Sequence, residues 1–96
     1  MTTYRLPPRG PTDLNVCIAL TWLKDSHQVQ VVEDSSANLW FMEYGTKRKR
    51  PAPPDILAAC IDGGGAEMNE SGGLSLVVIT NAGRYQAQRF QKLNKL

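Results

Sequence analysis

The residues best suited to chemistry in this chain are four consecutive cations, Lys47 to Arg50. Adjacent positive side chains repel one another and contribute little to folding, so a polyanionic partner is an economical explanation for them. If all four met phosphates of a nucleic acid, the logarithm of the binding constant would fall against the logarithm of salt concentration with a slope of about −3.6. The run therefore indicates a nucleic-acid contact. A solvated loop and a contact with an acidic protein are the alternatives.

The other reactive residues form no catalytic pattern. The single histidine, His27, and the two cysteines, Cys17 and Cys60, have spacings that fit neither a zinc site nor a nucleophile with its base. The glycines at 63–65 are not followed by the Lys-Ser/Thr pair that a phosphate loop requires. We therefore expect no enzymatic activity, no metal and no cofactor.

Composition is that of an ordinary globular domain. The 96 residues suffice for one core, and 42% hydrophobic and 21% charged residues are typical values. No stretch approaches the roughly 18 apolar residues that a membrane span needs. Cys17 and Cys60 fall at apolar positions of predicted helices, which favours buried free thiols and a reducing compartment. We expect a cytoplasmic protein with no membrane contact.

The C-terminal third predicts a helix, a hairpin and a second helix. Apolar residues recur at helical spacing over 55–63, and the glycines 63–65 end that helix. Residues 74–79 alternate as a strand does, and the turn at 71–73 pairs them with 66–70. Thr80 is a suitable N-cap for the last helix.

Several short stretches of this third define a recognisable order: Ile56-Leu57, Cys60-Ile61, Gly64 or Gly65, Val78-Ile79-Thr80 and Gly83-Arg84. In this order they resemble the C-terminal half of a winged helix-turn-helix domain, over about residues 55–92. The resemblance implies that helix 55–63 faces the major groove of DNA and that the turn at 70–74 is the wing.

This chain departs from that pattern in its charges. Asp55 and Asp62 bracket the helix that would face DNA, and the wing contains no Lys or Arg. Because carboxylates repel phosphates, the basic contacts would come from residues 47–50, with Arg84 and Arg89 on the last helix.

The N-terminal half begins with a helix and a strand. We expect Thr12 to cap a helix at 13–26, with Asp13 in its first turn, and the alternation over 28–33 predicts a strand.

Residues 39–44 are ambiguous. Their aromatic content favours a strand that pairs with 28–33, whereas Ser36 and Gly45 would suit the two ends of a short helix. A complete helix-turn-helix needs the helix. The strand gives instead the order helix, hairpin, helix, hairpin, helix.

Two proline-rich segments lie outside these elements. Residues 1–11 are expected to be a flexible arm, which leaves 12–96 as a single winged-helix-like domain. The connector 45–54 is basic and proline-rich, and we expect it to be exposed.

The sequence thus predicts an α+β fold, a small winged-helix-like domain with helices packed on short antiparallel hairpins. We expect a DNA-binding regulator of bacterial or phage type that uses Lys47, Arg48, Lys49, Arg50, Arg84 and Arg89. We expect its last helix to serve in packing or in the formation of a homodimer. The alternative is a protein-interaction module, such as an inhibitor or adaptor of a nucleic-acid-handling complex, with Trp40, Phe41 and Tyr44 as exposed anchors rather than core residues.

Overall fold

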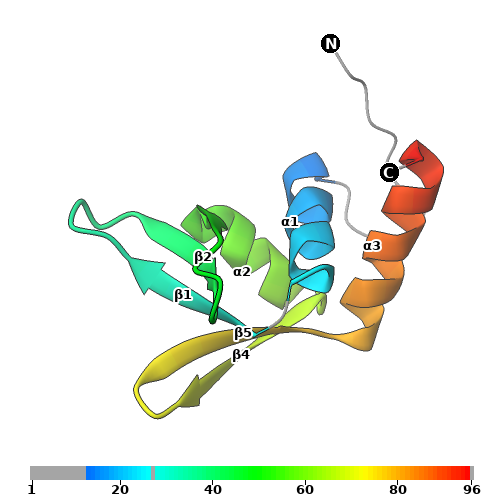
Figure 1. Cartoon of the computed structure of the whole chain (residues 1–96). Helices are drawn as coiled ribbons and strands as arrows, with labels where there is room; N and C mark the ends of the chain where they lie inside the picture. Colours follow the sequence, from blue (N-terminus) through cyan, green and yellow to red (C-terminus); the bar gives the residue numbers. More distant parts are fainter. Residues whose placement is uncertain (1–12, 27, 96) are drawn as a thin grey trace.

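Five strands form one antiparallel sheet, and three helices lie on one side of it (Figure 1). The computed structural model describes residues 13–26 and 28–95, so the arm 1–11, Thr12 and His27 lie outside the described residues. The elements are α1 (Leu14–Lys24), β1 (Val29–Glu33), β2 (Leu39–Glu43), β3 (Lys49–Pro51), α2 (Pro54–Asp62), β4 (Ala66–Ser71), β5 (Leu74–Ile79) and α3 (Asn81–Asn94). The predicted α+β class is confirmed.

The strand order is β3-β2-β1-β5-β4, which places β1 at the centre. Val31 of β1 lies opposite Phe41 of β2, and Val29 lies opposite Val77 of β5. The side chains of Val29, Phe41 and Val77 point to the helices and are almost fully buried. Burial of such side chains stabilises each by about 1.5–3 kcal/mol, so this face of the sheet is one half of the core.

The helices supply the other half of the core. Leu20 and Leu23 of α1 and Leu57 of α2 are buried in the same cluster as the sheet residues. α3 packs along α1, with Ala87 and Phe90 buried. None of the helices in the described part of the chain combines the length and the apolar character of a membrane span.

Local chemistry sets the ends of the helices. Asp13, not Thr12, is the N-cap of α1, because its Oδ1 accepts a hydrogen bond from the Asn15 N–H at 2.7 Å. α2 begins at Pro54, where a missing N–H costs no hydrogen bond, and ends at Gly63. Thr80 caps α3 as predicted, its Oγ1 accepting from the Gly83 N–H at 3.0 Å.

α3 is anchored to the loop after α2 at one close contact. Thr80 Oγ1 donates a hydrogen bond to the Gly64 carbonyl at 2.6 Å, and the Thr80 N–H donates to the Gly65 carbonyl at 3.0 Å. A side chain at Gly83 would collide with the backbone of Gly65. Glycine at 83 is therefore required by the approach of two backbones.

Residues 39–43 form strand β2, so the strand alternative is confirmed and the short helix is not formed. The connector 45–54 was expected to be exposed throughout, and this is wrong at two points. β3 forms within it and pairs with β2, with Arg50 half-buried, and Ala52 is completely buried. Three strands, rather than a second helix, therefore join α1 to α2.

Candidate nucleic-acid interface

The basic run is held in an ordered turn and edge strand rather than in a loose loop. In the turn before β3, the Glu43 N–H donates to the Arg48 carbonyl at 2.7 Å and the Lys47 N–H donates to the Glu43 carbonyl at 3.0 Å. Thr46 Oγ1 donates to Glu43 Oε1 at 2.7 Å and accepts from the Arg48 N–H at 3.2 Å. These bonds fix the backbone from which the cations project.

The alternation of side chains along a strand divides the cations between the two faces of the sheet. Arg48 lies on the helix side, with its Cζ 5.3 Å from the centre of the Trp22 ring and its Nη2 3.3 Å from Ser26 Oγ. Lys49 lies on the opposite side, with Nζ 4.8 Å from the centre of the Trp40 ring. Arg50 returns to the helix side, opposite Phe41. One nucleic-acid strand on the helix side would therefore meet two arginines, not four cations.

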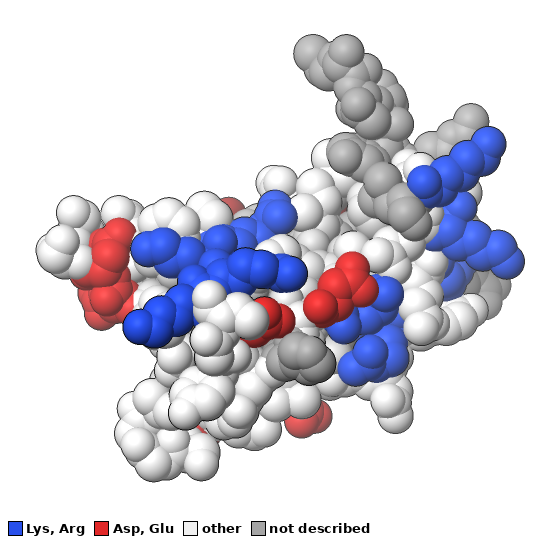
Figure 2. Space-filling model, viewed as in Figure 1, with Lys and Arg blue, Asp and Glu red and all other residues white. Residues whose placement is uncertain are grey.

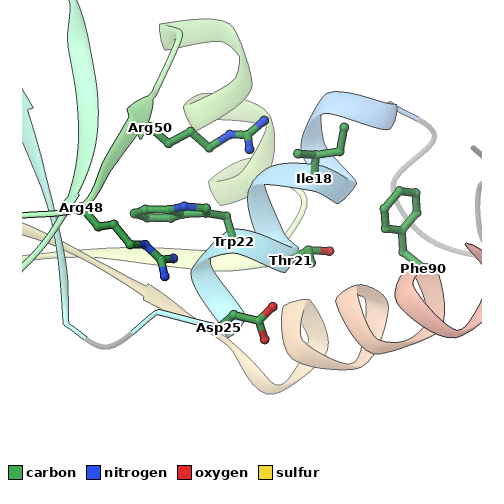
Figure 3. Close-up of a pocket in the computed structure, with 7 residues that line it drawn as sticks. All are labelled: Ile18, Thr21, Trp22, Asp25, Arg48, Arg50 and Phe90. Atoms are coloured by element: carbon green, nitrogen blue, oxygen red, sulfur yellow. The ribbon is translucent and has the colours of Figure 1, made fainter. Parts of the chain in front are cut away.

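A hollow of about 340 Å³ lies beside Arg48 and Arg50, between α1, β3 and α3 (Figure 3). Its other walls are Ile18, Thr21, Trp22 and Asp25 of α1 and Phe90 of α3. A second hollow of about 280 Å³ lies along the N-terminal part of α1, and Arg50 lines both. Arg50 thus stands between two adjoining depressions on the α1 side of the sheet.

Little within the domain neutralises these arginines. Among the described residues, the side chain of Arg50 forms no hydrogen bond, ion pair or ring contact, and no carboxylate lies within ion-pairing distance of Lys47 to Arg50. The carboxylate of Asp25, at the edge of the hollow, lies 2.9 Å from Lys24 Nζ and accepts from Gln91 Nε2 at 3.2 Å. Arg50 is half-buried as a residue, but none of its side-chain nitrogens is fully removed from water, so its N–H donors remain available to a ligand.

The predicted basic residues do not all gather in one place. Figure 2 shows Lys and Arg over the β2–β3 end of the sheet and, separately, along α3. Arg84 is exposed on α3, and Arg89 lies with its Cζ 5.5 Å from the centre of the Tyr85 ring. The two are five residues apart, about 140° around the helix, and neither lines the hollow.

The aromatic residues of β2 and the tyrosine that follows it have three different environments. Phe41 is 1% exposed and belongs to the core, Trp40 is half-buried, and Tyr44 is 64% exposed. Phe41 is therefore a core residue and not an anchor for a partner, whereas Tyr44 is available to one.

The helix and turn that the winged-helix resemblance would bring to DNA carry no positive charge. The outward residues of α2 are Asp55, Ala58, Ala59 and Asp62, all exposed. The β4–β5 turn at 71–73 consists of a serine and two glycines. This part of the surface repels phosphates rather than attracting them.

Both cysteines are buried on facing helices and form no disulfide, in agreement with the prediction of buried thiols. Burial, with smaller contributions from Cys17 and Asp13, raises the pKa of the Cys60 thiol to about 11. Burial also raises the pKa of Cys17, with a smaller contribution from Asp13. Protonated buried thiols are poor nucleophiles, and no group of acidic, histidine or cysteine residues able to hold a metal occurs in the described part of the chain.

Trp22 was not foreseen as part of the site. It lies 26 positions before Arg48, and only the pairing of β3 with β2 brings the two together, since Trp22 also stacks on Phe41 of β2 with ring centres 6.2 Å apart. No spacing in the sequence reveals that contact.

No protein-family model, no curated protein and no solved structure matches the chain. A function for this protein is therefore inferred from the geometry described above.

Proposed function

We propose that this protein binds nucleic acid, and that Arg48 and Arg50 hold phosphate groups at the rim of the hollow beside α1. The observation that carries the proposal is Arg50, a half-buried residue whose guanidinium forms no hydrogen bond or ion pair among the described residues. Guanidinium groups bind phosphate through two parallel hydrogen bonds, which makes a phosphate oxygen the natural partner.

The arrangement of Arg48 supports the same proposal. Stacking on Trp22 and the hydrogen bond to Ser26 Oγ hold its guanidinium at the hollow that Arg50 also lines before any ligand arrives (Figure 3). Such preorganisation lowers the entropy cost of binding.

Within this proposal the α2–β4–β5–α3 half is a winged-helix-like scaffold and not the reading surface. The carboxylates of Asp55 and Asp62 would repel a duplex laid on α2, so β3 and the neighbouring surface of α1 make the contact. We further propose a regulatory role of the kind that small DNA-binding proteins have.

The test is a titration of the full chain with labelled duplex and single-stranded DNA at several salt concentrations. With two phosphates bound on the helix side, the slope of log K against log salt for duplex DNA should be about −1.8, half the value expected for all four cations. The variant Arg48→Ala/Arg50→Ala should lose most of this binding and most of its salt dependence.

The matched control is Lys92→Ala/Lys95→Ala, which removes the same charge from exposed positions on α3 and at its C-cap. This control should bind DNA within about threefold of the parent, because exposed cations far from the contact act only through the screened field. Equal losses in the two variants would mean that net charge alone drives binding, and would contradict a specific phosphate site at Arg48 and Arg50. Absence of DNA binding at low salt would remove the proposed function.

A protein-interaction module is the second candidate, and the exposed ring of Tyr44 favours it. An aromatic residue largely free of the core is a typical anchor at a protein interface. If the parent fails to bind DNA, capture of a partner from cell extract that is lost in Tyr44→Ala would support this candidate.

A further inference from the structure

The face of the sheet opposite the helices is largely apolar, and no helix or strand among residues 13–26 and 28–95 covers it. Val29, Phe41 and Val77 point to the helices, so the residues beside them in the strands point away. We call the opposite side the open face; its apolar residues are Val32, Trp40, Met42, Leu74, Leu76 and Val78, none of which belongs to the core cluster. In Figure 1 all three helices lie on the other side.

An antiparallel sheet with one solvated face normally carries polar residues there. β5 does not follow this rule, because Leu74 and Val78 on the open face are 44% and 47% exposed while Val77 points into the core. Apolar residues on both sides are typical of a strand that is covered on both sides. The open face therefore requires a cover.

The register of the strands makes the open face nearly symmetric about its centre. One row of paired residues crosses all five strands in the order Lys49, Met42, Gln30, Leu76 and Asn69. Gln30 of the central strand lies in the middle, a large apolar residue lies on each side of it, and a polar residue lies at each edge. A surface of this kind is complementary to itself under a two-fold rotation.

Gln30 itself lacks a partner. Its residue is only 9% exposed, and its side-chain amide forms no hydrogen bond among the described residues. The amide nitrogen and oxygen of Gln30 are not fully removed from water in one copy, and an amide offers both donors and an acceptor to a partner. A second Gln30 facing the first could supply both sides of the missing hydrogen bonds.

We propose that a second copy of this chain covers the open face, with the two-fold axis along β1. The rotation places Met42 of each copy over Leu76 of the other and Gln30 over Gln30. Extended by one residue beyond Val31 and Ser75, the last paired positions of β1 and β5, the same rotation places Trp40 over Leu74, with Val32 on the axis. The two sheets would form a sandwich with a shared apolar layer about 10 Å thick.

The charges at the two edges agree with this arrangement. Lys49 lies on the open face at the β3 edge, and Glu67, which pairs with Val78, lies on the same face at the β4 edge. The rotation brings the β3 edge of one copy over the β4 edge of the other, so Lys49 meets Asn69 directly and Glu67 diagonally. Within one copy the two charges are four strand spacings apart, roughly 19 Å.

Trp40 is already fixed in position on this face. Its Nε1 donates to Asp34 Oδ2 at 2.9 Å, and Lys49 Nζ lies near its ring. The hydrogen bond from Trp40 is the main reason why the pKa of Asp34 is lowered. A tryptophan held in one orientation loses little entropy when a partner packs on it.

The size of the open face sets the strength of the dimer. Five strands about 4.8 Å apart and about five residues long present roughly 400 Å² on each copy, so the dimer buries on the order of 1,000 Å² of accessible surface. This is the lower end of specific interfaces, and we expect a dissociation constant in the micromolar range. The helices face outward, so the hollow at Arg48 and Arg50 stays open and the dimer does not depend on the proposed function.

The first experiment is sedimentation equilibrium of the full chain at concentrations from about 1 to 300 μM, a range that spans the expected micromolar dissociation constant. The variant Val78→Lys should raise the dissociation constant by about 100-fold or more, because it puts two charges into the apolar layer. Val78 is half exposed in one copy, so the monomer should fold, which a thermal melt checks.

The matched control is Leu93→Lys, an apolar-to-lysine change on the outer side of α3, where Leu93 is 39% exposed. It should leave the dimer unchanged. A dimer lost in Leu93→Lys and kept in Val78→Lys would assign the interface to α3 and overturn the proposal. A parent that is monomeric at all concentrations would also overturn it. That result is expected if another segment of the same chain covers the face.

The second experiment reverses the edge charges. Lys49→Glu and Glu67→Lys should each weaken the dimer severalfold, and the double variant should restore it, since the opposite charges meet again. Within one copy these residues are too far apart to interact directly, so restoration requires two copies. Additive weakening in the double variant would contradict the proposed geometry.

Discussion

The two faces of the sheet are built from neighbouring residues of the same strands, yet they have opposite relations to the helices. Phe41 is almost fully buried against α1, while Trp40, one position earlier in β2, faces away from every described helix. The covered face is complete within one chain. The open face is equally apolar along β5 but is covered by none of the described elements, which teaches that apolar character alone does not tell which side of a strand is the core.

The largest expected effects come from truncation of two adjacent residues of β2, one on each face of the sheet. Phe41→Ala should lower the free energy of unfolding by about 3–5 kcal/mol, because it leaves a cavity in the shared core. Trp40→Ala should cost about 1 kcal/mol or less in the dilute monomer and should instead abolish the dimer. Urea unfolding at a concentration well below the dissociation constant of the dimer measures the first effect, and sedimentation measures the second.

Equal losses of stability in the two monomers would mean that Trp40 is covered within one chain. The distinction between the faces would then disappear.

The pH dependence of stability tests how well the core on the helix side excludes water from Cys60. The pKa of the Cys60 thiol is raised from 9.0 to about 11, so the folded state holds its proton more tightly than the unfolded state does. The resulting stabilisation is fully present below pH 9 and is lost as the pH rises toward 11. It amounts to about 2–3 kcal/mol.

Urea unfolding of the parent and of Cys60→Ala across pH 8 to 11 measures this loss. Lysines and tyrosines titrate in both proteins, so only the difference between the two curves counts. Parallel curves would show that Cys60 is accessible to water in the folded protein.

The smallest of these effects concerns the centre of the open face. Gln30→Glu changes one amide to a carboxyl and places two carboxylates across the proposed axis. We expect the dimer to weaken about tenfold at pH 7 and to recover near pH 4, where the carboxyls are protonated.

Gln88→Glu on the exposed side of α3 introduces the same charge and should leave the dissociation constant of the dimer unchanged. A dimer indifferent to Gln30→Glu at both pH values would move the axis away from β1.

Periodicity alone was enough to place most elements. The bounds of α1, β1, α2, β4, β5 and the cap at Thr80 follow from local chemistry, and the structure agrees with them to within a few residues. β3 was missed because it has three residues and ends in a proline, so no pattern of alternation can develop. Thr12 was predicted to cap α1, but the N-cap is Asp13, because its carboxylate accepts a hydrogen bond from the Asn15 N–H.

The site was harder to predict than the fold. Lys47 to Arg50 were identified from their charge, but their division between two faces depends on β3, and their contacts with Trp22 and Trp40 depend on pairings distant in sequence. The open face had a visible signal, since Leu74, Leu76 and Val78 are apolar on the same side as one another. That signal became meaningful only once the strand order had placed β1 between β2 and β5.

The shortness of β3 also bears on how this protein behaves when concentrated. An edge strand with free N–H and C=O groups can recruit another strand and extend into fibrils. Pro51 at the end of β3 has no N–H to offer, and Lys49 and Arg50 would repel the same edge of an approaching molecule. The β3 edge therefore blocks templated growth of the sheet from that side.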